Sequence, residues 1–387
     1  MVDLDMAPEN VRSPHGRAGE SDDCVAPALR TAAEALATGR ARRGRRSPLG
    51  TPVAATRLIL TITDPTTMRL LTFRDPDEGR PTLGVRYGQR VLDIAVAARI
   101  AGIAGMPTTL KALLAAGPNA MARVRELSGA SQAHDGSRFD AAWRDEATLD
   151  YLAPIDDADK FLCVGKNYRQ HLEELQRTNL IKEIPDEPTA FVKLNSSLVG
   201  HRAEVVRPEG IVRLDYEPEL VFVIGRRALG VKKAEAFNCV AGVTILNDLT
   251  DRDSQEREVK SGSRFWTGKN IPGFGPLGPE LITLDEIADP YDLWMTCSVN
   301  GQLRMRVNTS DQIWKLPDIV EHFSRHIPIE PGDMFSTGAP GGVAVGKPNA
   351  AELFLKPGDV VECGIEGFAT LRTTIVSPSP RKVAAPA

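Results

Sequence analysis

The sequence predicts an α+β protein dominated by β-strands, in which a small N-terminal α/β domain precedes a larger domain. Short apolar runs separated by Gly, Pro and Asn recur from residue 151 onward, and this punctuation is typical of strands. Helical patterns are few there, and they do not alternate with the strands as in a doubly wound sheet. The chain has 387 residues, of which 42% are apolar, so it is long enough for a large core and too long for one average domain.

Residues 1–67 differ from the rest of the chain. They are rich in Ala, Arg, Pro, Ser and Gly, contain no aromatic residue and include the basic run GRARRGRRS. Such a segment can bury little apolar surface, so we expect a disordered extension. A transit peptide is the alternative, but DLDMAPEN and GESDD are acidic where such peptides are poor in acid. The stretch MRLLTFRD at Met68 resembles a natural protein start, which favours an upstream extension of the reading frame.

The two domains are expected at residues 68–150 and 151–380. In the first, RLLTF and PTLGVRYGQRVLDIA predict strands, and TTLKALLAAG predicts a helix. In the second, the Asn-Gly pair of VNGQ predicts a tight type I′ hairpin turn. The strands expected in the second domain are KFLCVG, PTAFVKL, ELVFVIG, VAGVTILND, LWMTCSVNGQLRMRV, DMFSTG, DVVECGIEG and ATLRTTIV, and the helices are YRQHLEELQRT, KKAEAFN and LPDIVEHFSRH.

Charge and cysteine content limit the class of partner. The formal net charge is −4, and no basic patch dominates beyond the first fifty residues, so we expect no nucleic acid and no membrane as partner. No apolar run approaches the roughly 18 residues that span a bilayer. The 5 cysteines lie far apart, which favours reduced thiols in a cytoplasmic protein over disulfides or a zinc site.

An unusual cluster of carboxylates lies in the predicted strand RLDYEPELVFVIG. Side chains two residues apart on a strand point to the same face, so Glu217 and Glu219 are neighbours, and Asp215 can join them. Adjacent carboxylates repel, and a buried pair requires a cation or hydrogen bonds. The alternative is a solvated acidic edge. Pro218 fits an edge position or a bulge.

A second acidic element, TILNDLTDRDSQ, places Asp248 where another predicted strand ends. Three carboxylates without a nearby His or Cys form a hard oxygen site, which suits Mg²⁺ or Mn²⁺, with Ca²⁺ as a further candidate, and not zinc. Such a site leaves coordination positions for water and a chelating substrate.

A candidate acid–base pair lies in NYRQHLEEL. His171 and Glu174 are three residues apart, so a helix places them on one face, while Glu173 points elsewhere. A carboxylate beside an imidazole sets its tautomer and raises its basicity, which suits a general base. An ordinary surface pair is the alternative.

Six blocks occur in the order found in the fumarylacetoacetate hydrolase (FAH) family, which the chain resembles over residues 155–376. The N-terminal part from Met68 is similar to the small domain of many bacterial members. The resemblance implies an FAH-type mixed β-sandwich roll around a divalent ion, and a homodimer. The blocks are FLCVGKNYRQHLEEL, DYEPELVFVIG, ILNDLTDRDSQ, FWTGKNIPGFGPLGP, VNGQLRMRVNTSDQIWKLPDIVEHFSR and PGDMFSTGAPGGV.

The resemblance also implies roles for individual residues, with Asp215 as a neighbour that is not a ligand. Arg252 has a structural alternative, a bridge to Asp248 or Asp253. Tyr168 and Lys193 either line the pocket or support it. The implied metal ligands are Glu217, Glu219 and Asp248; the implied catalytic residues are His171, Glu174 and Lys269; the implied substrate-binding residues are Arg252, Gln255, Tyr168, Thr337 and Gly338.

The chain departs from the family pattern at one turn. Many members have Gly-Thr-Pro where this chain has Gly338-Ala339-Pro340, and Gly341 replaces the usual basic residue. Ala339 has no hydroxyl for a substrate carboxylate, although the backbone N–H groups of the turn remain. Thr337 points the same way if the backbone is extended. These differences affect the choice of substrate.

The activity implied by the resemblance is metal-dependent C–C bond hydrolysis of acylpyruvate or 1,3-diketo acid substrates through a metal-chelated enolate, as in aromatic compound catabolism. Decarboxylation of oxaloacetate-like 2-oxo acids and isomerisation of 2-hydroxymuconate-type diacids are alternatives on the same metal site. A non-catalytic metal-binding scaffold is a further alternative. The presence of His171, Glu174 and Lys269 together with the three carboxylates argues against the scaffold.

Overall fold

A computed structural model describes residues 68–133, 136–177 and 185–378, so the expectation for residues 1–67 lies outside the described residues. The helices are α1 (Ile94–Ala101), α2 (Leu110–Ala115), α3 (Pro118–Gln132), α4 (Arg169–Arg177), α5 (Arg252–Lys260), α6 (Trp266–Lys269), α7 (Leu316–Ser324) and α8 (Ala350–Leu353). The strands are β1 (Arg69–Arg74), β2 (Pro81–Tyr87), β3 (Arg90–Asp93), β4 (Trp143–Asp145), β5 (Asp150–Leu152), β6 (Phe161–Gly165), β7 (Thr189–Val192), β8 (Leu198–Val199), β9 (Glu204–Val206), β10 (Leu214–Asp215), β11 (Pro218–Ile224), β12 (Val240–Asn247), β13 (Thr250–Asp251), β14 (Gly275–Thr283), β15 (Trp294–Val299), β16 (Gln302–Asn308), β17 (Met334–Ser336), β18 (Val360–Ile365) and β19 (Ala369–Val376).

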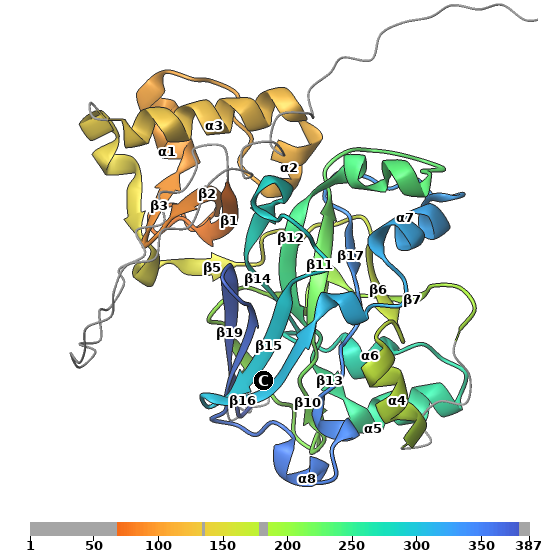
Figure 1. The fold of residues 1–387 in the computed structure, drawn as a ribbon. Helices are drawn as coiled ribbons and strands as arrows, with labels where there is room; N and C mark the ends of the chain where they lie inside the picture. Colours follow the sequence, from red (N-terminus) through yellow and green to blue (C-terminus); the bar gives the residue numbers. More distant parts are fainter. Residues whose placement is uncertain (1–67, 134–135, 178–184, 379–387) are drawn as a thin grey trace, which may run out of the picture. The chain divides into compact units, whose positions relative to one another are not determined.

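A large mixed sheet runs through the described part of the chain (Figure 1). Its strand order is β4-β3-β2-β1-β14-β12-β11-β17-β6-β7, with β5 paired to β1 and β8 paired to β14. Most neighbours are antiparallel, whereas β17 pairs with β6, and β14 with β8, in parallel. The predicted strand-dominated α+β class is confirmed.

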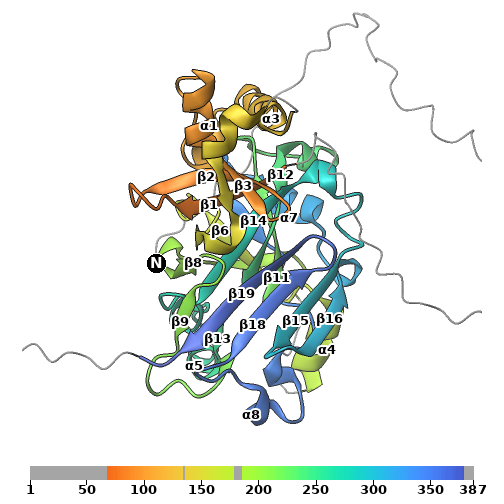
Figure 2. The ribbon, with the colours of Figure 1, turned by 90° about the vertical axis from the view of Figure 1, so that its left-hand side faces the viewer.

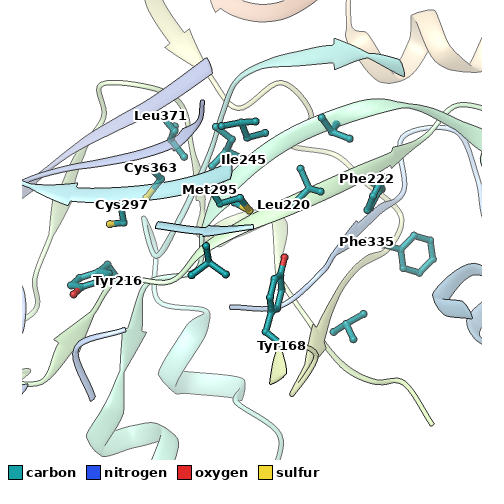
Figure 3. Packing of buried hydrophobic residues seen from close by; sticks show 14 of the residues in the cluster. Tyr168, Tyr216, Leu220, Phe222, Ile245, Met295, Cys297, Phe335, Cys363 and Leu371 are labelled. Atoms are coloured by element: carbon teal, nitrogen blue, oxygen red, sulfur yellow. The ribbon is translucent and has the colours of Figure 1, made fainter. Parts of the chain in front are cut away.

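A second sheet packs against the large one and completes a sandwich. Its order is β16-β15-β18-β19-β9, and Figure 2 shows these strands side by side. The core between the sheets contains Leu220 and Phe222 from β11, Ile245 from β12, and Cys297 and Cys363 from the second sheet (Figure 3). In a β-sandwich the apolar faces of the two sheets pack against each other in this way.

The N-terminal strands belong to the large sheet. Strand β1 pairs antiparallel with β14, and α1 and α2 pack on β2 and β1. A second core contains Leu70 and Leu113 from this part together with Val221 from β11 and Leu246 from β12. The expected division at residue 150 therefore stays a prediction. None of the helices in the described ranges is long and apolar enough to cross a membrane.

Strand β11 separates the two cores, and this places its carboxylates. Leu220 and Phe222 face the sandwich core, while Val221 faces the second core. Because side chains alternate along a strand, Glu219 lies on the same face as Val221. Pro218 is the first residue of the strand, opposite Asn247, and β17 pairs only from Val221 onward. Pro218 therefore pairs on one side only, which agrees with the expected edge position at this end of an otherwise interior strand, whereas the register shift of β11 lies at Val223/Ile224 and the expected bulge at Pro218 is wrong.

Local sequence signals predicted several elements well. The Asn-Gly turn joins β15 to β16, with φ of 52° at Asn300 and 75° at Gly301, as a type I′ turn requires. Helices form as expected at α2, α4 and α7, whereas KKAEAFN forms a 3₁₀ helix at Lys233–Cys239. Helix α5 was not predicted, because its acidic first turn resembled a loop. Asp251 caps it by accepting a hydrogen bond from Asp253 N at 3.2 Å.

Gly242 in β12 provides a test of the packing between strands. A Cβ atom there would lie 2.2 Å from the Ile282 carbonyl oxygen of β14, and that backbone cannot move freely. We expect Gly242→Ala to lower the free energy of unfolding by about 1–3 kcal/mol. In the matched control Gly129→Ala, in α3, the added Cβ meets nothing within 4 Å. This control should raise stability by about 1 kcal/mol through helix propensity. Urea denaturation of both variants measures the difference, and equal stability would contradict the packing.

Candidate functional site

Three buried carboxylates meet where β11 begins and β12 ends. Glu217 immediately precedes β11, Glu219 lies within it, and Asp248 immediately follows β12. Asp248 N donates to Glu217 O at 2.8 Å, which joins the two strand ends. One carboxylate oxygen from each residue lies within 4.8 Å of the others. The structure thus brings the three predicted ligands together in the interior, and the solvated acidic edge is wrong.

The electrostatics of this triad fit a divalent cation. Burial raises the pKa of Glu219 well above its usual range, and the charges of Asp248 and Glu217 raise it further. Burial also raises the pKa of Glu217, but Arg252 and Lys269 outweigh that effect and lower it to about 2. Repulsion among buried oxygen donors is what a hard cation relieves. The acidic triad can therefore hold a metal ion of this class.

Two buried lysines contact the triad. Lys269 Nζ donates to Glu217 and Asp248. Burial lowers the pKa of Lys269, but the two carboxylates outweigh it, so the pKa is raised. Lys193 Nζ donates to Asp248 Oδ1 at 2.9 Å, to Phe274 O at 2.9 Å and to the Lys269 carbonyl. Lys193 therefore uses its three protons inside the protein, and it supports the site.

Aromatic rings cover the Lys269 ammonium. Its Nζ lies 5.3 Å from the centre of the Phe191 ring and 6.0 Å from that of Phe265, and the two rings meet edge to face. This arrangement places a cation on aromatic faces, which stabilises the charged lysine. Phe265 has a left-handed backbone, with φ of 49°. Phe191 and Phe265 are far apart in the sequence, and their spacing carries no signal of this contact.

Arg252 begins α5 and points toward the triad. Its Nη2 lies 2.5 Å from Glu217 Oε1 and 2.8 Å from Asp215 Oδ2, and its Nη1 donates to Gln255 Oε1 at 2.8 Å. Asp253 pairs with Arg213 instead. The expected bridge from Arg252 to Asp248 or Asp253 does not form, because the start of the helix aims the guanidinium at β10 and β11.

His171 and Glu174 are buried on α4. His171 Nδ1 lies 3.6 Å from Glu174 Oε2, and the residues are 7% and 6% exposed. Gly342 N donates to Glu174 Oε1 at 2.9 Å and Oε2 at 3.1 Å. His171 is near enough to the triad for its charge to lower the pKa of Glu217. The surface-pair alternative is wrong, because the helix face turns inward.

The remaining predicted residues lie in or beside residues 337–346, which follow β17 and are called the Gly-rich turn here. Tyr168 Oη and Thr337 Oγ1 lie 3.2 Å apart, and Gln312 Nε2 donates to Tyr168 Oη at 3.1 Å. Both Tyr168 and Thr337 are buried, so contact of either with a substrate stays a prediction. Gly338 has φ of 90°, and a Cβ there would lie 2.4 Å from the Val164 carbonyl oxygen. Glycine is required at that position.

Two further residues at the site were missed or underestimated. Ser336 Oγ donates to Glu219 Oε2, and the parallel pairing of β17 with β6 could not be foreseen from the sequence. Asp215, expected to be a neighbour without a role, binds Arg252 through two nitrogens. Its position two residues before Glu217 was the available signal, because alternate residues share a face.

Known proteins resemble this chain over most of its length. Oxaloacetate tautomerase FAHD2A, a mitochondrial protein of Homo sapiens, is 35% identical over 311 residues, which cover 80% of this chain and 92% of that protein. The solved structure of a fumarylacetoacetate hydrolase from Exiguobacterium antarcticum matches with a TM-score of 0.63 and 29% identity, over 80% of this chain and all of that one. A 2-hydroxyhepta-2,4-diene-1,7-dioate isomerase from Mycobacterium marinum matches with a TM-score of 0.59 and 28% identity, over 81% and 100%.

The family comparison covers the sandwich and every residue of the triad. The model for the fumarylacetoacetate (FAA) hydrolase C-terminal domain matches residues 160–376, which include α4, β11, β12 and the Gly-rich turn. This range agrees with the ordered blocks found in the sequence. The chain belongs to the fumarylacetoacetate hydrolase family.

Proposed function

We propose that this protein is a divalent-metal-dependent enzyme that interconverts the keto and enol forms of an oxaloacetate-like 2-oxo diacid. The observation that carries the proposal is the buried triad of Glu217, Glu219 and Asp248 beside the cationic side chains of Lys269 and Arg252. Such a site can stabilise negative charge on a substrate carbonyl oxygen in a water-poor interior. The name of the human relative supports this choice of reaction.

Glu217, Glu219 and Asp248 would hold the metal. When bound, Mg²⁺ or Mn²⁺ supplies Lewis-acid polarisation of the substrate oxygens. Lys269 adds a fixed positive charge that Glu217 and Asp248 hold in the ammonium form. This charge stabilises the oxygen that becomes negative when a proton leaves the adjacent carbon.

His171 is the proposed general base. Its imidazole removes a proton from the carbon next to the carbonyl, and the electron pair of that C–H bond moves to form the enol double bond. The protonated imidazole then gives this proton to the carbonyl oxygen, which completes the keto-to-enol step and returns the base to its starting form, and the reverse sequence regenerates the keto form. Glu174 orients the imidazole from 3.6 Å and stabilises its protonated form. Burial of both side chains limits exchange of that proton with water.

Arg252, Gln255, Tyr168, Thr337 and Gly338 are the proposed contacts for the substrate carboxylates. Arg252 fixes the Gln255 amide through its oxygen, which leaves the amide nitrogen as a donor. Ala339 is apolar and 7% exposed, so the turn offers its backbone N–H groups in place of a hydroxyl.

C–C bond hydrolysis of an acylpyruvate is the second candidate. The buried His171–Glu174 pair favours it, because the same base can activate a water molecule. The solved relative named as a fumarylacetoacetate hydrolase is consistent with this reaction. Decarboxylation of oxaloacetate and isomerisation of a muconate-type diacid are further outcomes at the same site. The products distinguish the four reactions.

Assembly and location are separate proposals. We propose a homodimer in the cytoplasm, and light scattering of the purified chain tests the dimer. The four cysteines in the described ranges (Cys163, Cys239, Cys297 and Cys363) are free and buried, which supports a reducing compartment.

The substrate class is tested with oxaloacetate, acylpyruvates and ring-cleavage diacids, each with Mg²⁺ or Mn²⁺ and with EDTA controls. We expect rapid ketonisation of enol-oxaloacetate, followed by its ultraviolet absorbance, and loss of that activity in EDTA because the triad cannot polarise a carbonyl by itself. Release of a cleaved acid pair with no change in tautomerisation rate would instead establish the hydrolase.

The metal site is tested with Glu219→Gln. We expect Mn²⁺ affinity to fall by at least about 100-fold in calorimetry, because an anionic ligand becomes neutral. Metal should then no longer raise the melting temperature of the variant.

Glu280→Gln is the matched control for Glu219→Gln. Glu280 is equally buried, pairs with Arg86 and lies outside the triad. This variant should lose stability while binding Mn²⁺ as the wild type does. Equal Mn²⁺ affinity for Glu219→Gln and the wild type would refute the assigned ligand.

The base is tested with His171→Asn. We expect kcat to fall by about 10²–10⁴-fold, because proton transfer from carbon loses its base, while KM and Mn²⁺ affinity change little. Glu173→Gln is the control, since Glu173 is an exposed residue on the same helix and should leave kcat unchanged. Undiminished kcat in His171→Asn would exclude the imidazole from the reaction.

A further inference from the structure

Asp215 is a completely buried carboxylate that collects hydrogen bonds from three separate segments. Its Oδ1 accepts from Tyr216 N at 2.9 Å and Ala344 N at 2.9 Å. Its Oδ2 accepts from Val345 N at 3.0 Å and from Arg252 Nε at 2.9 Å, and Arg252 Nη2 lies 2.8 Å away. Every one of these contacts requires an acceptor, and an ionised carboxylate is an acceptor at both oxygens.

One side of this arrangement leads to the carboxylate triad. The guanidinium of Arg252 contacts Asp215 and Glu217 through the same nitrogen, Nη2, and positions Gln255 through Nη1. Because Asp215 anchors Nε and Nη2 together, the planar guanidinium has one orientation. That orientation keeps Arg252 in contact with Glu217 of the triad and Gln255 in contact with Arg252.

The other side leads to α4. Residues 341–346 of the Gly-rich turn pack tightly against α4. A Cβ on Gly341 would lie 2.6 Å from Gln170 Cγ. A Cβ on Gly346 would lie 2.8 Å from Glu174 Oε2. The same turn donates to Glu174 through Gly342 N. Asp215 holds this turn by accepting hydrogen bonds from the consecutive amides of Ala344 and Val345.

We propose that Asp215 is a positioning residue. It connects the Gly-rich turn, against which the His171–Glu174 helix packs, to Arg252 and Glu217 at the triad. One rigid side chain then fixes the position of the proposed base, His171, relative to the guanidinium of Arg252. The kinetic part of the proposal rests on the proposed function. The structural part, a shared anchor for the turn and the guanidinium, does not.

The contacts explain why a carboxylate is needed at residue 215. An asparagine has the same shape but replaces one oxygen with an N–H₂ donor. In one orientation that donor faces Val345 N and Arg252, and in the other it faces Ala344 N and Tyr216 N. The first orientation removes the hydrogen bonds from Val345 N and Arg252, and the second removes the one from Ala344 N, so either orientation takes away one of the two amides by which residue 215 holds the turn. The backbone of β10 stays held by its pairing with β13, so the substitution acts on the side-chain contacts.

The test compares Asp215→Asn with Asp93→Asn in the full chain. Asp93 is equally buried, accepts from Val96 N at 3.0 Å and pairs with Arg144 at 3.1 Å, far along the chain from the triad. Both variants should melt earlier than the wild type. In Asp215→Asn we expect kcat to fall and KM to rise, each by about tenfold, as for other residues that orient a site. Asp93→Asn should keep both constants within about twofold of the wild type.

Hydrogen–deuterium exchange supplies a readout without substrate. In Asp215→Asn, the amides of Ala344 and Val345 and those of α4 should exchange at least about fivefold faster, because the turn loses its anchor. Asp93→Asn should leave them unchanged. Equal exchange in the two variants overturns the connection, whatever the activity. If the wild type acts on no 2-oxo diacid, the proposed function fails, and the exchange result still decides the connection.

Arg252→Lys is the second variant if Asp215→Asn does not fold. A lysine keeps the positive charge but lacks the planar group that contacts Asp215 and Glu217 together. The proposal predicts faster exchange at Ala344 and Val345, because Asp215 loses its other anchor. Unchanged exchange at these amides in Arg252→Lys overturns it.

Discussion

Four buried carboxylates face three buried cations at the junction of β10, β11 and β12, and the local structure depends on how their charges are balanced. The carboxylates are Asp215, Glu217, Glu219 and Asp248, and the cations are Lys193, Arg252 and Lys269. Taking charges out of water is costly unless each finds a partner. Here each cation contacts at least one carboxylate. Glu219 instead accepts a hydrogen bond from the Ser336 hydroxyl and lies beside the other acids. The excess of carboxylates is the physical basis for a divalent cation.

The fold supplies the rigidity that such a cluster needs. Strands β11 and β12 are interior to the large sheet and have apolar cores on both faces, so the backbone that carries the triad cannot move toward solvent. Helices α4 and α5 then bring the polar groups from outside the sheet. His171 and Glu174 come from α4, and the guanidinium of Arg252 comes from α5. Buried charges on rigid elements are preorganised, which is the condition for strong electrostatic stabilisation of a reacting substrate.

The relatives of this chain are named for several different reactions. Proteins named as a tautomerase, a hydrolase and an isomerase all resemble this chain. In the proposed mechanism one base serves either proton removal next to a polarised carbonyl, as in tautomerisation, or activation of a water molecule, as in hydrolysis. The turn that contains Ala339 and Gly341 departs from the motif on which the sequence resemblance rests.

The sequence by itself determined the strand-rich class, the type I′ turn at Asn300–Gly301, the two glutamates on one strand face and the pairing of His171 with Glu174, because each depends on contacts within a few residues. The ordered motifs also identified the family. The tertiary structure alone decided that Arg252 contacts Asp215 and Glu217, that Lys193 forms an ion pair with Asp248, and that Pro218 starts an interior strand. These features depend on which strands pair across more than a hundred residues, as β17 does with β11 and β6. No local pattern encodes that pairing, because it is chosen by the packing of both cores at once.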